Sequence, residues 1–114
     1  MMKVDTKLEG NVLMVILEGE VDMSSSGQVW DAISPFLEGK KPKAKAAVID
    51  LSRVTYMDSS GIATIVRAWQ TTKKSGGKLK LAAPSPSVQD VFELAHVNTI
   101  FEICASVEEA RKGL

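Results

Sequence analysis

The sequence predicts an α/β fold: a single domain, residues 1–114, with a mixed β-sheet of about five strands, an N-terminal hairpin and about four helices packed against the sheet. Three observations support this prediction. The chain has 114 residues, which suits one domain with its own core. Short apolar runs alternate with segments of helical spacing, the order that produces parallel strand pairs. The first two apolar runs flank a tight-turn sequence, which adds an antiparallel pair.

The two N-terminal strands are expected at residues 4–8 and 12–17, separated by Glu9, Gly10 and Asn11, which are typical of a hairpin turn. Residues 12–17 are nearly all apolar, so we expect this strand to be covered on both faces. The mixed polar sequence at residues 18–22 is expected to end it.

The first helix is expected after three serines at residues 24–26, which can act as N-caps. Its apolar side chains follow the spacing i, i+4, i+7 and i+8: Val29, Ile33, Phe36 and Leu37. Glycine, lysine and proline at residues 39–43 end the helix. Residues 44–51 then form a buried central strand.

The second half of the chain repeats this alternation. Asp58 can cap a helix with Ile62, Ile65, Val66 and Trp69 on one face, and residues 73–77 close it with lysines and glycines. A strand follows at residues 79–83. Ser85 and Pro86 begin a third helix, whose inward side chains are expected to be Val88, Val91, Phe92 and Ala95. A strand at 100–104 and a helix at 107–112 complete the fold.

Composition excludes several classes of protein. The 14 basic and 14 acidic side chains give a net charge of zero, whereas a nucleic-acid partner calls for a basic excess. The only cysteine, Cys104, leaves no internal disulfide and no zinc site of thiolates, and one histidine, His96, cannot anchor a metal. We expect no cofactor and no metal. The sequence contains no signal-peptide pattern and no apolar run of membrane-spanning length, so we expect a cytoplasmic protein without membrane insertion.

The zero net charge hides an uneven distribution. Residues 1–38 carry a net charge of −5, residues 39–80 carry +8, and residues 81–114 carry −3. The basic middle segment includes a lysine group that we interpret as a solvated loop: Lys40, Lys41, Lys43 and Lys45. Asp58, one of only two acids in this segment, begins the most informative motif of the chain.

That motif is Asp58-Ser59-Ser60-Gly61, which follows a strand and opens a helix. Free backbone N–H groups and the positive end of the helix dipole favour an anion there. With Asp58 as the N-cap, Ser59 stands at the first helical position and points outward. Capping chemistry alone is the competing interpretation of the motif.

The chain resembles the STAS-domain anti-sigma-factor antagonists, small bacterial proteins that release sigma factors by capturing their anti-sigma kinases. The resemblance covers nearly the whole chain. The matching segments, in order, are residues 17–22 (Leu-Glu-Gly-Glu-Val-Asp), 48–52, 57–62, 76–79, and 86–88 leading to Phe92.

This resemblance implies that Ser59 is phosphorylated by a GHKL-type anti-sigma-factor serine kinase that supplies ATP, and that a serine phosphatase resets it. Ser60 would then serve the helix start, and Gly61 would allow a close backbone approach. The implied partner-binding residues are Gly19, Glu20, Asp22, Met23, Met57, Asp58, Ser59, Ser60 and Gly61. Ala63 departs from the family, where many members have a second glycine. We expect a monomer or weak dimer that is not an enzyme.

Several alternatives stay open at this point. The same fold could serve as the STAS subunit of an ABC-type lipid-transport complex or as a stressosome-like scaffold, binding without a phospho-switch. A serine hydrolase would need a base and a G-x-S-x-G elbow, which the sequence lacks. Met23 and Met57 flank the two implied interface loops and suit an adaptable contact surface, but core packing is an equal interpretation for each. Cys104 is expected to be a small buried hydrophobe, and His96 a residue at a helix end.

Overall fold

A computed structural model describes residues 2–114 and contains a five-stranded sheet in the order β1-β2-β3-β4-β5. The strands are β1 (Met2–Glu9), β2 (Val12–Val21), β3 (Ala46–Met57), β4 (Lys78–Ala82) and β5 (Glu102–Cys104). β1 pairs antiparallel with β2, and the other pairs are parallel. The predicted mixed sheet with an N-terminal hairpin is therefore confirmed.

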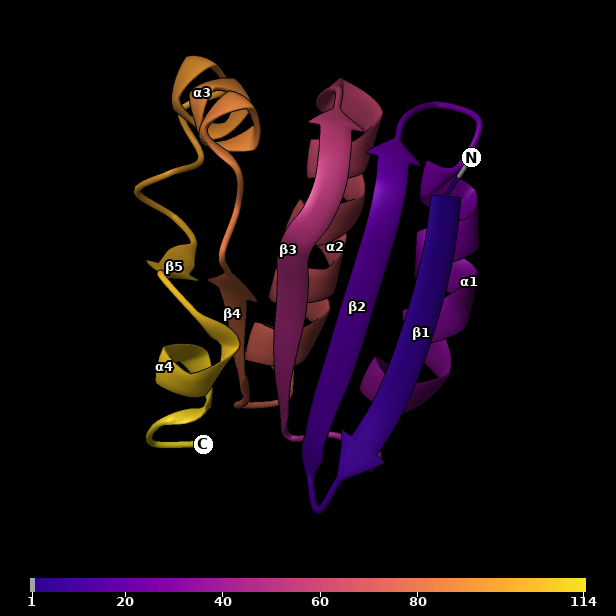
Figure 1. The fold of residues 1–114 in the computed structure, drawn as a ribbon. Coiled ribbons are helices and arrows are strands. Elements are labelled where there is room, and N and C mark those ends of the chain that lie inside the picture. The colour runs from indigo at the N-terminus through magenta and orange to yellow at the C-terminus, as the bar shows by residue number, and fades with distance from the viewer. Residues whose placement is uncertain (1) are drawn as a thin grey trace.

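Four helices accompany the sheet within the described residues: α1 (Ser26–Leu37), α2 (Ser59–Lys74), α3 (Pro86–Leu94) and α4 (Val107–Arg111). In Figure 1, α1 and α2 lie side by side behind the sheet, α4 lies in front of it, and α3 stands beyond the end of β4. The predicted four helices are confirmed, with α4 one residue shorter than expected.

The main core lies between the sheet and helices α1, α2 and α3. Inward-facing side chains of β2 and β3 meet helix side chains that are almost fully buried, among them Leu13, Val15, Leu17, Ile49, Leu51, Ile33, Ile65 and Phe92. A smaller cluster around Val48 and Ala110 lies under α4 on the opposite face. Five residues of helix cannot cover a whole sheet face. The prediction that residues 12–17 are covered on both faces is wrong for this reason, and Ile16 is 37% exposed.

Three strands are longer than predicted. β1 spans Met2–Glu9, where residues 4–8 were expected. Residues 18–21 continue β2, and residues 52–57 continue β3, because their pairing persists to Val21 and Met57. Two register shifts interrupt the regular pairing of β2 with β3 along this polar sequence. The expectation that residues 18–22 end the strand is corrected by this pairing, which carries both strands out to the start of α2.

The helix faces agree with the sequence prediction except at their margins. On α2, Ile62 and Ile65 are buried as expected, but Ala68 and Thr72 complete the buried stripe, while Val66 and Trp69 are half-buried at its side. On α3, Ala95 is exposed because the helix ends at Leu94. His96 follows this end, exposed and with a φ of 58°, so its placement at a helix end is confirmed.

Candidate functional site

The candidate site lies where the carboxyl ends of β2 and β3 meet the N-terminus of α2. Val21 and Met57 are neighbours in the parallel register, and the Asp58 N–H donates to the Val21 carbonyl at 3.2 Å. Asp22 and Asp58 therefore follow adjacent strand ends at one end of the sheet (Figure 1). The two motifs, some 35 residues apart in the sequence, form one surface, which we call the Asp22/Asp58 surface.

Asp58 caps α2 as the sequence predicted. Its Oδ1 accepts from the backbone N–H groups of Ser60 at 2.9 Å and Gly61 at 3.3 Å, and from the Ser60 hydroxyl at 2.5 Å. The hydrogen bond from the Ser60 hydroxyl is the main reason why the pKa of Asp58 lies below its usual 3.8. Desolvation and the nearby charge of Asp22 act in the opposite direction and raise this pKa. Asp58 is thus an anion whose carboxylate is hydrogen-bonded to the first residues of α2.

Asp22 organises the turn that leads into α1. Its Oδ1 accepts from the Ser24 hydroxyl at 2.7 Å, the Ser24 N–H at 2.9 Å and the Ser25 hydroxyl at 3.2 Å. The Ser24 hydroxyl is the main cause that lowers the pKa of Asp22. A second anion therefore stands on the same surface.

Ser25 is the loop residue whose role the sequence interpretation missed. It precedes α1, but its side chain makes no N-cap bond to the helix. Its hydroxyl donates to the Glu20 carbonyl at 2.9 Å and accepts from the Asp22 N–H at 3.0 Å, which fixes the loop against the end of β2. The spacing Asp-x-Ser-Ser is a signal for such side-chain-to-backbone turns.

The two serines of the motif differ in their surroundings. Ser59 occupies the first position of α2 and is exposed, and its hydroxyl makes no hydrogen bond within residues 2–114. Ser60 is half-buried and its hydroxyl is held by Asp58. The outward position predicted for Ser59 is confirmed, and the Ser60 hydroxyl is bonded to the capping residue Asp58.

The remaining predicted partner-binding residues separate into exposed and buried ones. Glu20 is exposed at the end of β2, beside the half-exposed ring of Tyr56, and Met23 is 84% exposed. Gly19 is partly exposed, with a φ of 97°. These three can be reached by a partner.

Met57 and Gly61 lie beneath this surface. Met57 is 2% exposed, so the prediction that its side chain offers a contact surface is wrong, and the alternative of core packing holds. Gly61 is buried against Val21 and Met57: a methyl group there would lie 2.7 Å from Met57 Cγ and 2.9 Å from the Val21 carbonyl oxygen. The close backbone approach expected at Gly61 is thus present, and both residues support the surface from below.

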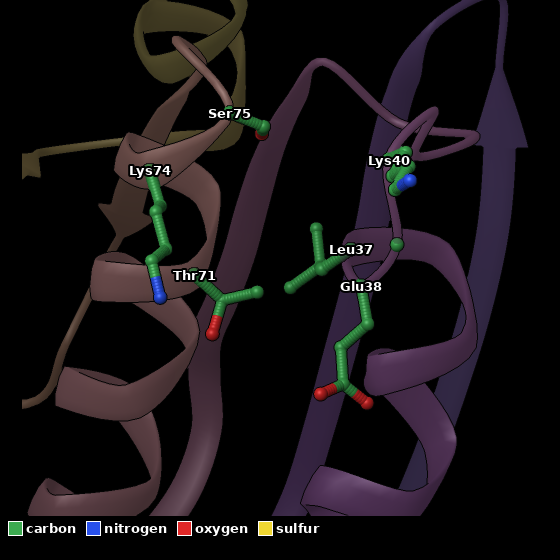
Figure 2. Close-up of a pocket in the computed structure, with 7 residues that line it drawn as sticks. Leu37, Glu38, Lys40, Thr71, Lys74 and Ser75 are labelled. Carbon is green, nitrogen blue, oxygen red and sulfur yellow. The ribbon is translucent and has the colours of Figure 1, made fainter.

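A group of lysines lies at the opposite end of the molecule, together with Glu38. The loop between α1 and β3 and the end of α2 border grooves lined by Lys40, Lys41, Lys45, Lys74, Ser75 and Gly76. Figure 2 shows one of these grooves, with Leu37 and Thr71 pointing toward each other between the two helices. Because α2 has 16 residues, Lys74 lies about 22 Å from Ser59 along the helix axis. This groove is therefore separate from the Asp22/Asp58 surface.

Two further observations concern residues 2–114. No cluster of three or more histidine, cysteine or acidic side chains there is arranged to hold a metal ion. Of the helices in this range, none combines the length and the apolar character needed to cross a membrane. Cys104 is half-buried, and desolvation is the main cause that raises the pKa of its thiol.

Comparison with known proteins places these features in a family. A family model described as the STAS domain matches residues 3–110. The anti-sigma-B factor antagonist of Bacillus subtilis (strain 168) is 31% identical over 105 residues, which cover 92% of this chain and 93% of that protein. An anti-sigma factor antagonist structure from Mycobacterium paratuberculosis superposes with a TM-score of 0.84 at 22% identity, covering 96% of this chain and 91% of that one.

The fold also matches the Bacillus cell fate determinant SpoIIAA in its phosphorylated form, with a TM-score of 0.72, 22% identity and 96% coverage of both chains. At such identities the structural likeness shows a shared fold. The family match over residues 3–110 and the 31% identical relative show, in addition, that the chain is a member of the family. This protein belongs to the STAS-domain family, and within it is homologous to the anti-sigma factor antagonists.

Proposed function

We propose that this protein is a cytoplasmic anti-sigma factor antagonist that binds a GHKL-type anti-sigma serine kinase through the Asp22/Asp58 surface and is released when Ser59 is phosphorylated. The unphosphorylated form captures the kinase and frees its sigma factor. The kinase transfers phosphate from ATP to Ser59, and a serine phosphatase restores binding. The protein itself is a binding partner and not an enzyme in this scheme.

The difference between the two serines is the observation that carries the proposal. An acceptor hydroxyl must reach the γ-phosphate of ATP in another protein, and Ser59 is exposed and free of hydrogen bonds within the described residues. The Ser60 hydroxyl would first have to break its hydrogen bond to the Asp58 carboxylate. Ser59 is therefore the better acceptor.

The position of Ser59 also accounts for a switch that leaves the fold intact. A phosphate adds about −1.5 to −2 charges at pH 7. The N-terminus of α2 tolerates an anion, so the domain stays folded. Asp22 and Asp58 already make this surface anionic, and the charge of Asp22 acts to raise the pKa of Asp58. A partner surface that accommodates a neutral hydroxyl here would meet a concentrated negative charge after modification.

The expected loss of affinity exceeds about tenfold, because like charges brought together in an interface cost several kcal/mol and about 1.4 kcal/mol corresponds to a factor of ten. Ser59→Asp should fold normally and lose kinase binding. Ser59→Ala should bind and resist phosphorylation. Ser60→Ala is the matched control: it should still accept phosphate on Ser59, although its helix start is weakened.

The test is incubation with candidate serine kinases from the same genome and ATP, followed by mapping of the phosphate by mass spectrometry and by binding measurements. Phosphate on Ser60 with Ser59 unmodified would overturn the assignment of the acceptor. Recovery by pull-down of an ATPase with transmembrane subunits, and of no such kinase, would instead favour a transport-complex subunit. Elution of the protein in large assemblies would favour a scaffold.

A further inference from the structure

The longest open edge of the sheet is the outer edge of β1. In Figure 1 the sheet ends at β1 on one side and at the three-residue β5 on the other. β1 has eight residues and follows β2 in unbroken register from Met2 opposite Gly19 to Glu9 opposite Val12. Such an edge presents a row of backbone donors and acceptors to any strand of matching side chains.

The hairpin geometry indicates which backbone groups face outward. A two-residue turn at Gly10 and Asn11 closes on a hydrogen-bonded pair, here Glu9 with Val12. Bonded and non-bonded pairs alternate along an antiparallel ladder, so the odd-numbered residues of β1 bond to β2. The N–H and C=O groups of Val4, Thr6 and Leu8 therefore point away from the sheet.

The side chains of β1 make this edge complementary to itself. On the face that carries α4, opposite charges alternate along the strand: Lys3, Asp5, Lys7 and Glu9. If two copies of β1 pair antiparallel with Thr6 opposite Thr6, Lys3 meets Glu9 and Asp5 meets Lys7, each twice. A shift of the register by two residues in either direction places Asp5 opposite an acid instead.

The other face of β1 fits the same register. Antiparallel pairing about Thr6 places Val4 of one copy beside Leu8 of the other. Val4 is half-buried and Leu8 is 38% exposed, so both side chains have apolar surface left to cover. The outward backbone groups fall on Val4, Thr6 and Leu8, the residues that this register brings face to face.

From this agreement of backbone, charge and apolar pattern, we propose that β1 is a homodimer interface that joins two copies of this chain through antiparallel β1–β1 pairing centred on Thr6. The two sheets then form one continuous sheet, and the interface is isologous, with the two-fold axis passing between the Thr6 residues. The proposal does not depend on the function of Ser59, which stands at the start of α2.

The Asp5–Lys7 pair decides the register. Asp5 is exposed and has no ion pair within residues 2–114, and its cross-strand neighbour in the monomer is the apolar Ile16. Glu9, in contrast, already contacts Arg111 at 2.8 Å and Lys7 at 3.9 Å. Charge changes at Asp5 therefore report on pairing between copies without breaking an ion pair inside one copy.

The test is sedimentation of the full chain over a concentration series up to about 1 mM, the range of weak association. The wild-type protein should change from 12.3 kDa to twice that mass as the concentration rises. Asp5→Lys places like charges opposite each other twice and should weaken the dimer by about two- to thirtyfold. Asp5→Lys combined with Lys7→Asp restores opposite charges and should restore association. Asp90→Lys, an exposed acid on α3, is the control and should leave it unchanged.

A second variant tests the backbone. Thr6→Pro removes the N–H that faces the partner copy and no N–H that bonds to β2, so it should give a folded monomer, which circular dichroism will verify. A wild-type protein that stays monomeric throughout the series overturns the proposal. So does a dimer that persists in Thr6→Pro and Asp5→Lys, because another surface must then hold it together.

Discussion

Replacing Gly61 with alanine tests whether the Asp22/Asp58 surface depends on close packing beneath it. The added methyl group would lie 2.7 Å from Met57 Cγ, 2.9 Å from the Val21 carbonyl oxygen and 3.0 Å from Val21 Cγ1. The methionine side chain can move, but the carbonyl belongs to β2 and accepts the Asp58 N–H at 3.2 Å. We expect the substitution to force α2 away from the end of β2.

The expected loss of stability follows from two opposing effects. Overpacking of a close contact costs about 1–3 kcal/mol, and replacing a helical glycine by alanine returns about 0.5–1 kcal/mol. The net loss is about 0–2.5 kcal/mol. An unfolding entropy of about 2.1 cal/mol/K per residue gives about 0.24 kcal/mol/K for this chain. The melting temperature should therefore fall by up to about 10 °C.

Thermal unfolding followed by circular dichroism measures this shift, and Gly27→Ala is the matched control. Gly27 lies in the first turn of α1, and a methyl group added there meets no atom within 4 Å. Gly27→Ala should therefore leave the melting temperature unchanged or raise it. If Gly61→Ala is as stable as Gly27→Ala, the contacts with Val21 and Met57 do not constrain the site and the reasoning fails.

Three further predictions concern stability. Because the folded-state pKa of Asp58 is lowered, its contribution to stability is present above its usual pKa of 3.8 and is lost as the pH falls through the folded-state pKa. Asp58→Asn keeps a capping side chain that does not titrate, so its melting temperature should fall less between pH 7 and pH 3 than that of the wild-type protein. Equal falls in the two proteins would contradict the assignment. Ser85→Ala removes the acceptor for the Val88 N–H and should cost about 1 kcal/mol in urea unfolding, and a loss near zero would show that α3 is not held by this cap. Phe92→Ala empties a fully buried position that packs edge-on against Phe101 at 5.9 Å and should cost about 3–5 kcal/mol in the same assay; a cost below about 1 kcal/mol would mean that α3 is not part of the core.

The sequence was most informative where the local chemistry decides the structure. An aspartate before two serines, a glycine and an apolar stripe is enough to predict the N-cap of α2 and the outward position of Ser59, because capping involves only neighbouring residues. The alternation of strands and helices predicted the mixed sheet for a similar reason, since each apolar period reflects one element.

What the sequence could not predict depends on pairing between strands. Val54 and Met57 both face the core although they are three residues apart, because register shifts between β2 and β3 interrupt the regular alternation. Met57 therefore lies beneath the site instead of on it. Ser25 is a similar case, since its hydroxyl bonds to Glu20 and Asp22 only after β2 extends through residues that a strand pattern alone does not include.

The separation of charge along the molecule has a consequence for how it approaches a partner. A chain with no net charge has little long-range attraction toward anything, but Asp22 and Asp58 near the start of α2 and the lysines near its end place opposite charges at the two ends of this helix, which together form an electric dipole. The electric field of a charged partner orients such a molecule before the two come into contact, within a range of about 8 Å set by physiological salt. A phosphate on Ser59 would enlarge this dipole and add a net negative charge. A positively charged phosphatase surface would therefore attract the modified protein and orient it with the phosphate toward the phosphatase.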